Sequence, residues 1–158
     1  MEKEYKPEVQ VYSEFLTDLL ACLAHESETL YKMFKGEVTQ LFFLDSFFLM
    51  SERTLRKWQI IMRHYLSRNV ELFDELLLKF NKVEGIFTSK VWVLQQKSLT
   101  FKRLAFLVYS SNIDSFDEQI DHLLKKMTEG FKASNKDREM RMQLFLLSRI
   151  IMLRLTST

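Results

Sequence analysis

Apolar residues recur along this chain at the three- and four-residue spacing of α-helices, and no stretch of useful length alternates as a strand would. Short polar gaps separate the periodic runs. The pattern predicts an all-α chain with helices over residues 7–24, 26–35, 37–49, 52–67, 70–81, 88–111, 115–131 and about 135–155.

The residues at these boundaries agree with helix ends. Pro7 suits the first turn of a helix, where its missing N–H costs nothing. Gly36, Gly85 and Gly130 each lie beside a polar gap where a helix can end. The linkers are short, so we expect residues 1–158 to form one helical domain. Four residues are predicted N-caps: Ser51, Asn69, Asp114 and Ser134.

The segment 90–109 carries apolar residues on two sides. One stripe contains Val93, Leu94, Phe101, Leu104, Ala105 and Val108, and a roughly opposite stripe contains Trp92, Leu99 and Phe106. Such a helix lies between two layers of structure, so we expect it to be central. The predicted architecture is stacked antiparallel helical hairpins, as in an α-solenoid of HEAT type, or a helical bundle.

The segment 135–155 is apolar on almost every side, which would leave a large exposed apolar face. We therefore expect the chain to be a C-terminal piece of a larger helical-repeat protein, in which a further helix covers this face. In this chain alone, Leu146, Ile150 and Leu153 are predicted to be partly exposed or covered by a second copy in a symmetric dimer. They are our candidates for a protein interface.

Composition narrows the class of protein further. Hydrophobic residues make up 47% of the 158 residues, which excludes disorder of the whole chain, and the formal net charge is only +2. The charged start, Met1 to Gln10, is no signal peptide, and the apolar run 41–50 is too short to span a bilayer. The lone Cys22 can form no internal disulfide, which favours a reducing, cytosolic location.

The sequence offers no constellation for catalysis. His25, His64 and His122 lie far apart in the sequence with no ligand spacing between them, and no phosphate-binding loop, nucleophile elbow or zinc motif is present. Cys22 is predicted to be a small core residue. Three carboxylates share one predicted helix face, with no base or nucleophile beside them, and we expect this face to be solvated: Asp117, Glu118 and Asp121. We therefore predict no enzyme, no metal site and no cofactor.

The predicted helix 52–67 and its C-terminal end carry a basic strip. Six positions fall within an arc of roughly 140°: Arg53, Arg56, Lys57, Arg63, His64 and Arg68. Five fixed positive charges in one strip attract anionic lipid headgroups, each by about 1 kcal/mol near a charged leaflet. The competing interpretation is a solvated face that pairs with acids of the next helix: Glu71, Asp74 and Glu75. Nucleic acid is not expected, because exposed aromatic residues do not interleave with the strip.

Short segments in a fixed order resemble the C-terminal region of the Dopey family. They are Leu41-Phe42-Phe43, Leu55-Arg56-x-Trp58 with Ile60-Ile61, Phe73-x-Glu75-Leu76, Lys102-Arg103-Leu104-Ala105-Phe106 with Ser110-Ser111, and Arg149-x-x-x-Leu153-Arg154-Leu155. None is a catalytic signature, so the specificity lies in the ordered set, which spans roughly residues 41–155.

This resemblance implies a non-catalytic scaffold or adaptor in protein traffic between endosomes and the trans-Golgi network. It implies a cytoplasmic protein, peripheral on Golgi and endosomal membranes, that works with a large scaffold related to Arf exchange factors. An aminophospholipid flippase, a kinesin light chain and phosphoinositide headgroups are further partners that the resemblance implies. The alternative function is a peripheral membrane module that binds phosphoinositide or other anionic headgroups through helix 52–67.

Overall fold

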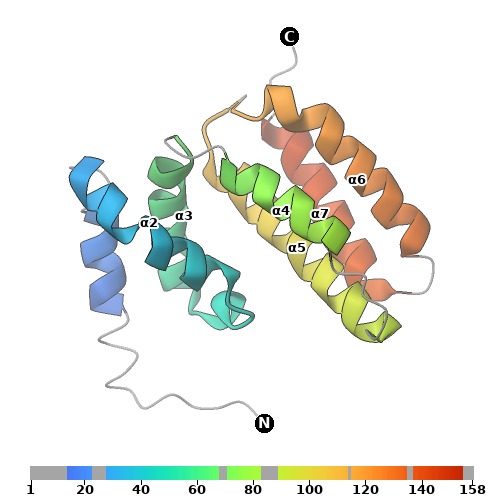
Figure 1. Cartoon of the computed structure of the whole chain (residues 1–158), viewed down its shortest axis with the longest axis horizontal. Coiled ribbons are helices and arrows are strands. Elements are labelled where there is room, and N and C mark those ends of the chain that lie inside the picture. Colours follow the sequence, from blue (N-terminus) through green and yellow to red (C-terminus); the bar gives the residue numbers. More distant parts are fainter. Residues whose placement is uncertain are drawn as a thin grey trace. The chain divides into compact units, whose positions relative to one another are not determined.

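The computed structural model describes residues 14–22, 28–67, 71–82, 89–113, 115–134 and 137–154, and these ranges contain helices and no strand. The predicted all-α class is therefore confirmed. The chain divides into two compact units, residues 1–68 and 69–158 (Figure 1). The expectation of a single domain stays a prediction.

The first unit contains a helix at residues 14–22, then α2 (Glu28–Phe43), the short 3₁₀ turn η1 (Phe47–Leu49) and α3 (Glu52–Leu66). Its core is aromatic. The Phe47 ring meets Phe42 and Trp58 edge-on, with centroids 5.1 Å and 5.2 Å away, and all three side chains are buried. Edge-to-face pairs of this kind add stability beyond the apolar area that they bury. The aromatic cluster thereby fixes the turn between α2 and α3.

Two polar contacts position α3 in this unit. The predicted cap Ser51 accepts a hydrogen bond from the Thr54 N–H at 3.2 Å, which satisfies one of the free amides at the start of α3. Near the other end, the Tyr65 hydroxyl lies 2.5 Å from Thr39 Oγ1 on α2. The helix thus begins where the sequence predicts, with its apolar side against α2 and η1.

The second unit contains α4 (Glu71–Lys82), α5 (Lys90–Ser110), the 3₁₀ turn η2 (Asp117–Gln119), α6 (Ile120–Ala133) and α7 (Arg138–Arg154). Helix α5 packs against both α4 and α7, and α6 packs against α7 (Figure 1). Phe101, Leu104 and Val108 of α5 are buried, so the predicted central position is confirmed. The second stripe is only partly covered, since Leu99 and Phe106 are half-buried and Trp92 is exposed.

Several sequence-based boundaries are wrong, among them the end of the predicted helix 37–49, because α2 already ends at Phe43. Gly85, Asn69 and Asp114 lie outside the described residues. Helix α2 runs through Gly36, so 26–35 and 37–49 are not separate helices; a helix interior tolerates a glycine at about 1 kcal/mol. Gly130 lies inside α6, buried against α5. Ser134 ends α6, whereas Asp137 caps α7 by accepting a hydrogen bond from the Met140 N–H at 2.7 Å.

Candidate functional surfaces

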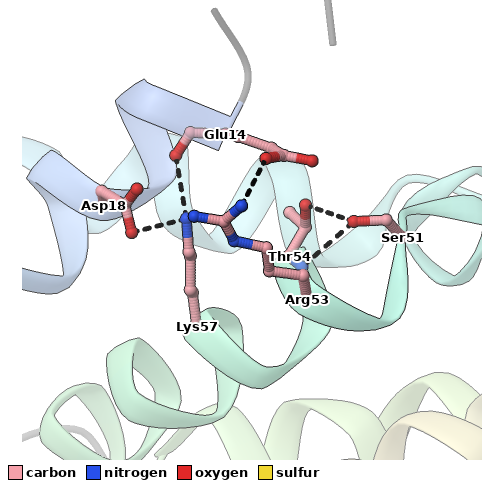
Figure 2. A network of polar contacts seen from close by, with 6 residues as sticks. All are labelled: Glu14, Asp18, Ser51, Arg53, Thr54 and Lys57. Atoms are coloured by element: carbon pink, nitrogen blue, oxygen red, sulfur yellow. Dashed lines mark hydrogen bonds and ion pairs between the residues drawn. The ribbon is translucent and has the colours of Figure 1, made fainter. Parts of the chain in front are cut away.

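Lys57 is the member of the basic strip whose side chain is held inside the protein. Its Nζ forms an ion pair with Asp18 at 2.5 Å and donates a hydrogen bond to the Glu14 carbonyl at 3.5 Å (Figure 2). Only 14% of the side chain is exposed. Both partners belong to helix 14–22, so Lys57 joins that helix to α3. A cation so engaged is poorly placed to meet a lipid headgroup.

The remaining strip residues differ in exposure. Arg53 is exposed and pairs with Glu14 Oε2 at 3.6 Å (Figure 2), while Arg56 is exposed and pairs with Glu52 Oε1 at 2.5 Å. Arg63 is exposed and His64 is half-buried. Arg68 lies outside the described residues. Exposed ion pairs contribute little free energy, so Arg53 and Arg56 can exchange these partners for another anion at low cost.

Two acids earlier in the chain pair with members of the strip. Glu14 and Asp18, one helical turn apart on helix 14–22, pair with Arg53 and Lys57. Glu75 of α4 pairs with Lys79 of its own helix at 3.4 Å, and the pairing of the strip with Glu71, Asp74 and Glu75 stays a prediction. Spacing within one helix could not reveal this, because the pairing depends on how helix 14–22 packs across α3.

A second surface, which we call the α7 surface, is an exposed arc of the last helix. It spans roughly 140° at 100° per residue and contains Arg138, Arg141, Met142, Phe145, Leu146, Arg149, Met152 and Leu153. The arc contains no acidic residue; Glu139 lies at its margin and accepts a hydrogen bond from Gln143 Nε2 at 2.7 Å. Five large apolar side chains and three arginines therefore share one face.

The predicted interface candidates divide between this surface and the core. Leu146 is 43% and Leu153 is 69% exposed, as expected, whereas Ile150 is only 9% exposed and does not belong to the surface. Ile150 lies on the side of α7 that packs into the unit. The sequence did not distinguish the members of the α7 surface from buried neighbours such as Leu147, because α7 is apolar on nearly every side.

Among the residues that the structure describes, the other chemically suggestive side chains do not assemble into a site. His122 is exposed on α6, and His25 lies outside the described residues. Cys22 is exposed, so its predicted core position is wrong: it lies on the outward side of helix 14–22. The three carboxylates Asp117, Glu118 and Asp121 are exposed, as expected of a solvated face. Within the described ranges, no group of three or more potential metal ligands occurs.

One small cavity lies in the second unit between the ends of α5 and α7 and the start of α6. Its volume of about 10 Å³ has room for roughly one water molecule and none for an organic substrate. Of the helices that the structure describes, none has the length and apolar character needed to cross a membrane. The candidate functional surfaces of the described residues are therefore exposed faces of helices.

The family model for the DOP1 C-terminal region matches residues 3–158, and the chain belongs to this family, which is also called Dopey. The resemblance seen in the sequence is confirmed. The family is known for trafficking roles at the Golgi and endosomes and is not known to be catalytic.

Relatives from animals align with most of this chain. It is 28% identical to Protein pad-1 of Caenorhabditis elegans over 117 residues, 71% of this chain, and 25% identical to the Protein DOP1 homolog of Drosophila melanogaster over 129 residues, 79% of this chain. Protein DOP1B of Mus musculus is 25% identical over 125 residues, again 79% of this chain. The chain covers only 5% of the length of each relative. No solved structure matches it.

Proposed function

We propose that this chain is a non-catalytic scaffold or adaptor domain in protein traffic between endosomes and the trans-Golgi network. The observation that carries the proposal is the α7 surface, where five large apolar side chains face outward together. Contiguous apolar surface of this kind is typical of a protein-binding face. Membership of the DOP1 family supports the cellular setting, the cytoplasmic face of Golgi and endosomal membranes.

The partner that we propose first is the large scaffold related to Arf exchange factors. An aminophospholipid flippase and a kinesin light chain are further proposed partners, and the scaffold role connects such proteins to the membrane. The chain itself would act by display, because its helices hold Leu146 and Leu153 in fixed positions for another protein.

The test uses the full-length protein in cells. Leu146→Glu with Leu153→Glu should reduce both co-precipitation of the large scaffold and Golgi localisation, because a charge then occupies the apolar contact. The control is Leu78→Glu, an equally apolar exposed position on α4. Unchanged co-precipitation and localisation with the double variant would count against the α7 surface as the functional one.

A second candidate function is binding of anionic lipid, including phosphoinositide, through α3. It is favoured by one observation: Arg53, Arg56 and Arg63 are exposed, and the apolar Ile60 among them is 47% exposed. Lys57, which belongs to the predicted strip, is engaged with Asp18. The proposed lipid site is therefore the three arginines, with Ile60 entering the interface.

Flotation with anionic and with neutral vesicles tests this candidate. Binding to anionic vesicles should weaken with salt, since exposed charges are screened beyond about 8 Å at physiological ionic strength. Arg53→Glu, Arg56→Glu and Arg63→Glu together should abolish it and leave the helical circular dichroism unchanged. If the unmodified chain does not float with anionic vesicles at low salt, the strip is a solvated face or a protein contact.

A further inference from the structure

We infer that the α7 surface binds an acidic amphipathic helix of a partner protein. The inference deepens the proposed function and rests on it, because it gives the chemistry of the partner that the scaffold would hold. Its basis is the combination of side chains on one exposed arc: Met142, Phe145, Leu146, Met152 and Leu153 with three arginines and no acid.

The apolar residues of this arc have the spacing that a second helix needs. Phe145 and Leu146 lie three and four residues after Met142, and Met152 and Leu153 continue the same side two turns later. Helices pack by placing side chains between such rows. The Phe145 ring also lies edge-on to Phe131 of α6, with centroids 5.6 Å apart, so one border of the surface is braced by a neighbouring helix.

The arginines specify the charge of the partner. Arg138 and Arg149 project near the middle of the arc, and Arg141 lies at its edge. Among the described residues, no ion pair involves any of the three. A guanidinium group covered by a partner requires a carboxylate, which it can bind through two parallel hydrogen bonds. The fitting helix therefore carries Asp or Glu within its apolar stripe, opposite Arg138 and Arg149.

This arrangement disfavours two other occupants. A lipid surface suits a face with cations at its edges, where they reach headgroups, whereas Arg149 lies between Phe145 and Leu153 around the helix, in the middle of the apolar side. In a symmetric dimer, the same three arginines of each copy would meet without any acid of the arc to neutralise them. Like charges enclosed in an interface oppose such an association.

The test is a selection with the full 158-residue chain as bait. A displayed library of amphipathic helices keeps leucine at the outer positions of the apolar stripe and varies its central positions among Glu, Lys, Gln and Ser. We expect Glu to be enriched at these central positions. The enriched helix, made as a peptide, should lose about tenfold or more in affinity with Leu146→Glu, and similarly with Arg138→Glu and Arg149→Glu together. Leu78→Glu and Arg56→Glu, exposed controls elsewhere, should leave its affinity unchanged.

Enrichment of basic or neutral residues at the central positions, or a peptide indifferent to both sets of variants, would overturn the inference. An empty selection would also overturn it. Self-association in sedimentation that Leu153→Glu removes would then indicate a second copy of the chain on the surface. Flotation with vesicles of phosphatidylcholine and phosphatidylserine that Leu146→Glu removes would indicate a lipid surface. The cellular test of the proposed function is separate. If the selection fails while Leu146→Glu with Leu153→Glu still disrupts localisation, the scaffold role stands and the acidic-helix partner does not.

Discussion

Gly130 of α6 and Phe101 of α5 approach so closely that a side chain cannot fit between them. A Cβ atom added to Gly130 would lie 2.7 Å from both Cε2 and Cζ of Phe101, and 3.2 Å from Leu144 Cδ2 of α7. Phe101 is fully buried, and its ring also meets Phe80 of α4 with centroids 5.0 Å apart. This one contact therefore connects all four helices of the second unit.

Gly130→Ala should destabilise the chain, because the buried ring has little room to move. Overpacking of a core costs typically 1–3 kcal/mol, and the better helix propensity of alanine returns up to about 1 kcal/mol. We expect a net loss of up to about 2 kcal/mol in urea unfolding. The matched control is Gly36→Ala, at an exposed helical glycine with nothing within 4 Å, which should stabilise by about 0.5–1 kcal/mol. Equal effects at both glycines would contradict the close packing.

Leu104→Ala should remove a fully buried side chain from the central helix α5. Core truncations of this kind cost roughly 2–5 kcal/mol, since they lose transfer free energy and leave a cavity. Thermal or urea unfolding measures the loss. The control Leu78→Ala removes the same atoms from an exposed position of α4 and should stay within about 0.5 kcal/mol. A loss below that range for Leu104→Ala would show that α5 is peripheral.

Lys57→Met should loosen the attachment of helix 14–22 to α3, because it removes the ion pair with Asp18 and the hydrogen bond to Glu14. Backbone amides of residues 14–22 should exchange with deuterium faster as a result. Arg56→Met is the control: its pair with Glu52 lies within α3 and is exposed, so exchange in 14–22 should not change. If exchange in 14–22 becomes faster in both variants, loss of either positive charge on α3 loosens the helix, and the specific contacts of Lys57 are not what holds it.

The pair Lys126–Glu129 on α6 should make stability depend weakly on acid pH. The hydrogen bond from Lys126 Nζ, 2.9 Å long, is the main reason that the pKa of the Glu129 carboxyl lies below its ordinary value. The folded state therefore binds this proton less tightly than the unfolded chain. Its contribution is present above the unfolded-state pKa and is lost as the pH falls through the lower, folded-state pKa.

Glu129→Gln should accordingly lower urea stability at neutral pH and make no difference once the carboxyl is protonated. The Glu129 side chain is 44% exposed, so solvent screening keeps the effect below about 1 kcal/mol. Asp121→Asn, which removes an exposed carboxylate from the first turn of α6, serves as the control. A difference between Glu129→Gln and the unmodified chain that persists in strong acid would contradict the assignment to this pair.

The sequence alone determined the helical class, most helix bounds and the central position of α5. The reason is local: apolar periodicity and caps such as Ser51 act within a few residues, so they can be read along the chain. The family was also accessible, because ordered short segments are preserved in the linear sequence. The predicted helix ends at Gly36 and Gly130 were wrong for a related reason. A glycine allows a helix to end but does not require it, and tertiary packing decides whether the helix continues, as it does at both positions.

Only the tertiary structure decided which residues of these helices form surfaces. Leu146 and Ile150 are equally apolar in sequence, yet one is exposed and the other buried, because α7 turns a single side into the unit. Arg53 and Lys57 both belong to the basic strip, but Lys57 alone is enclosed, because Asp18 and the Glu14 carbonyl meet it from a helix about forty residues earlier in the chain. Exposure and ion pairing depend on residues distant in sequence, and no spacing within one helix can supply them.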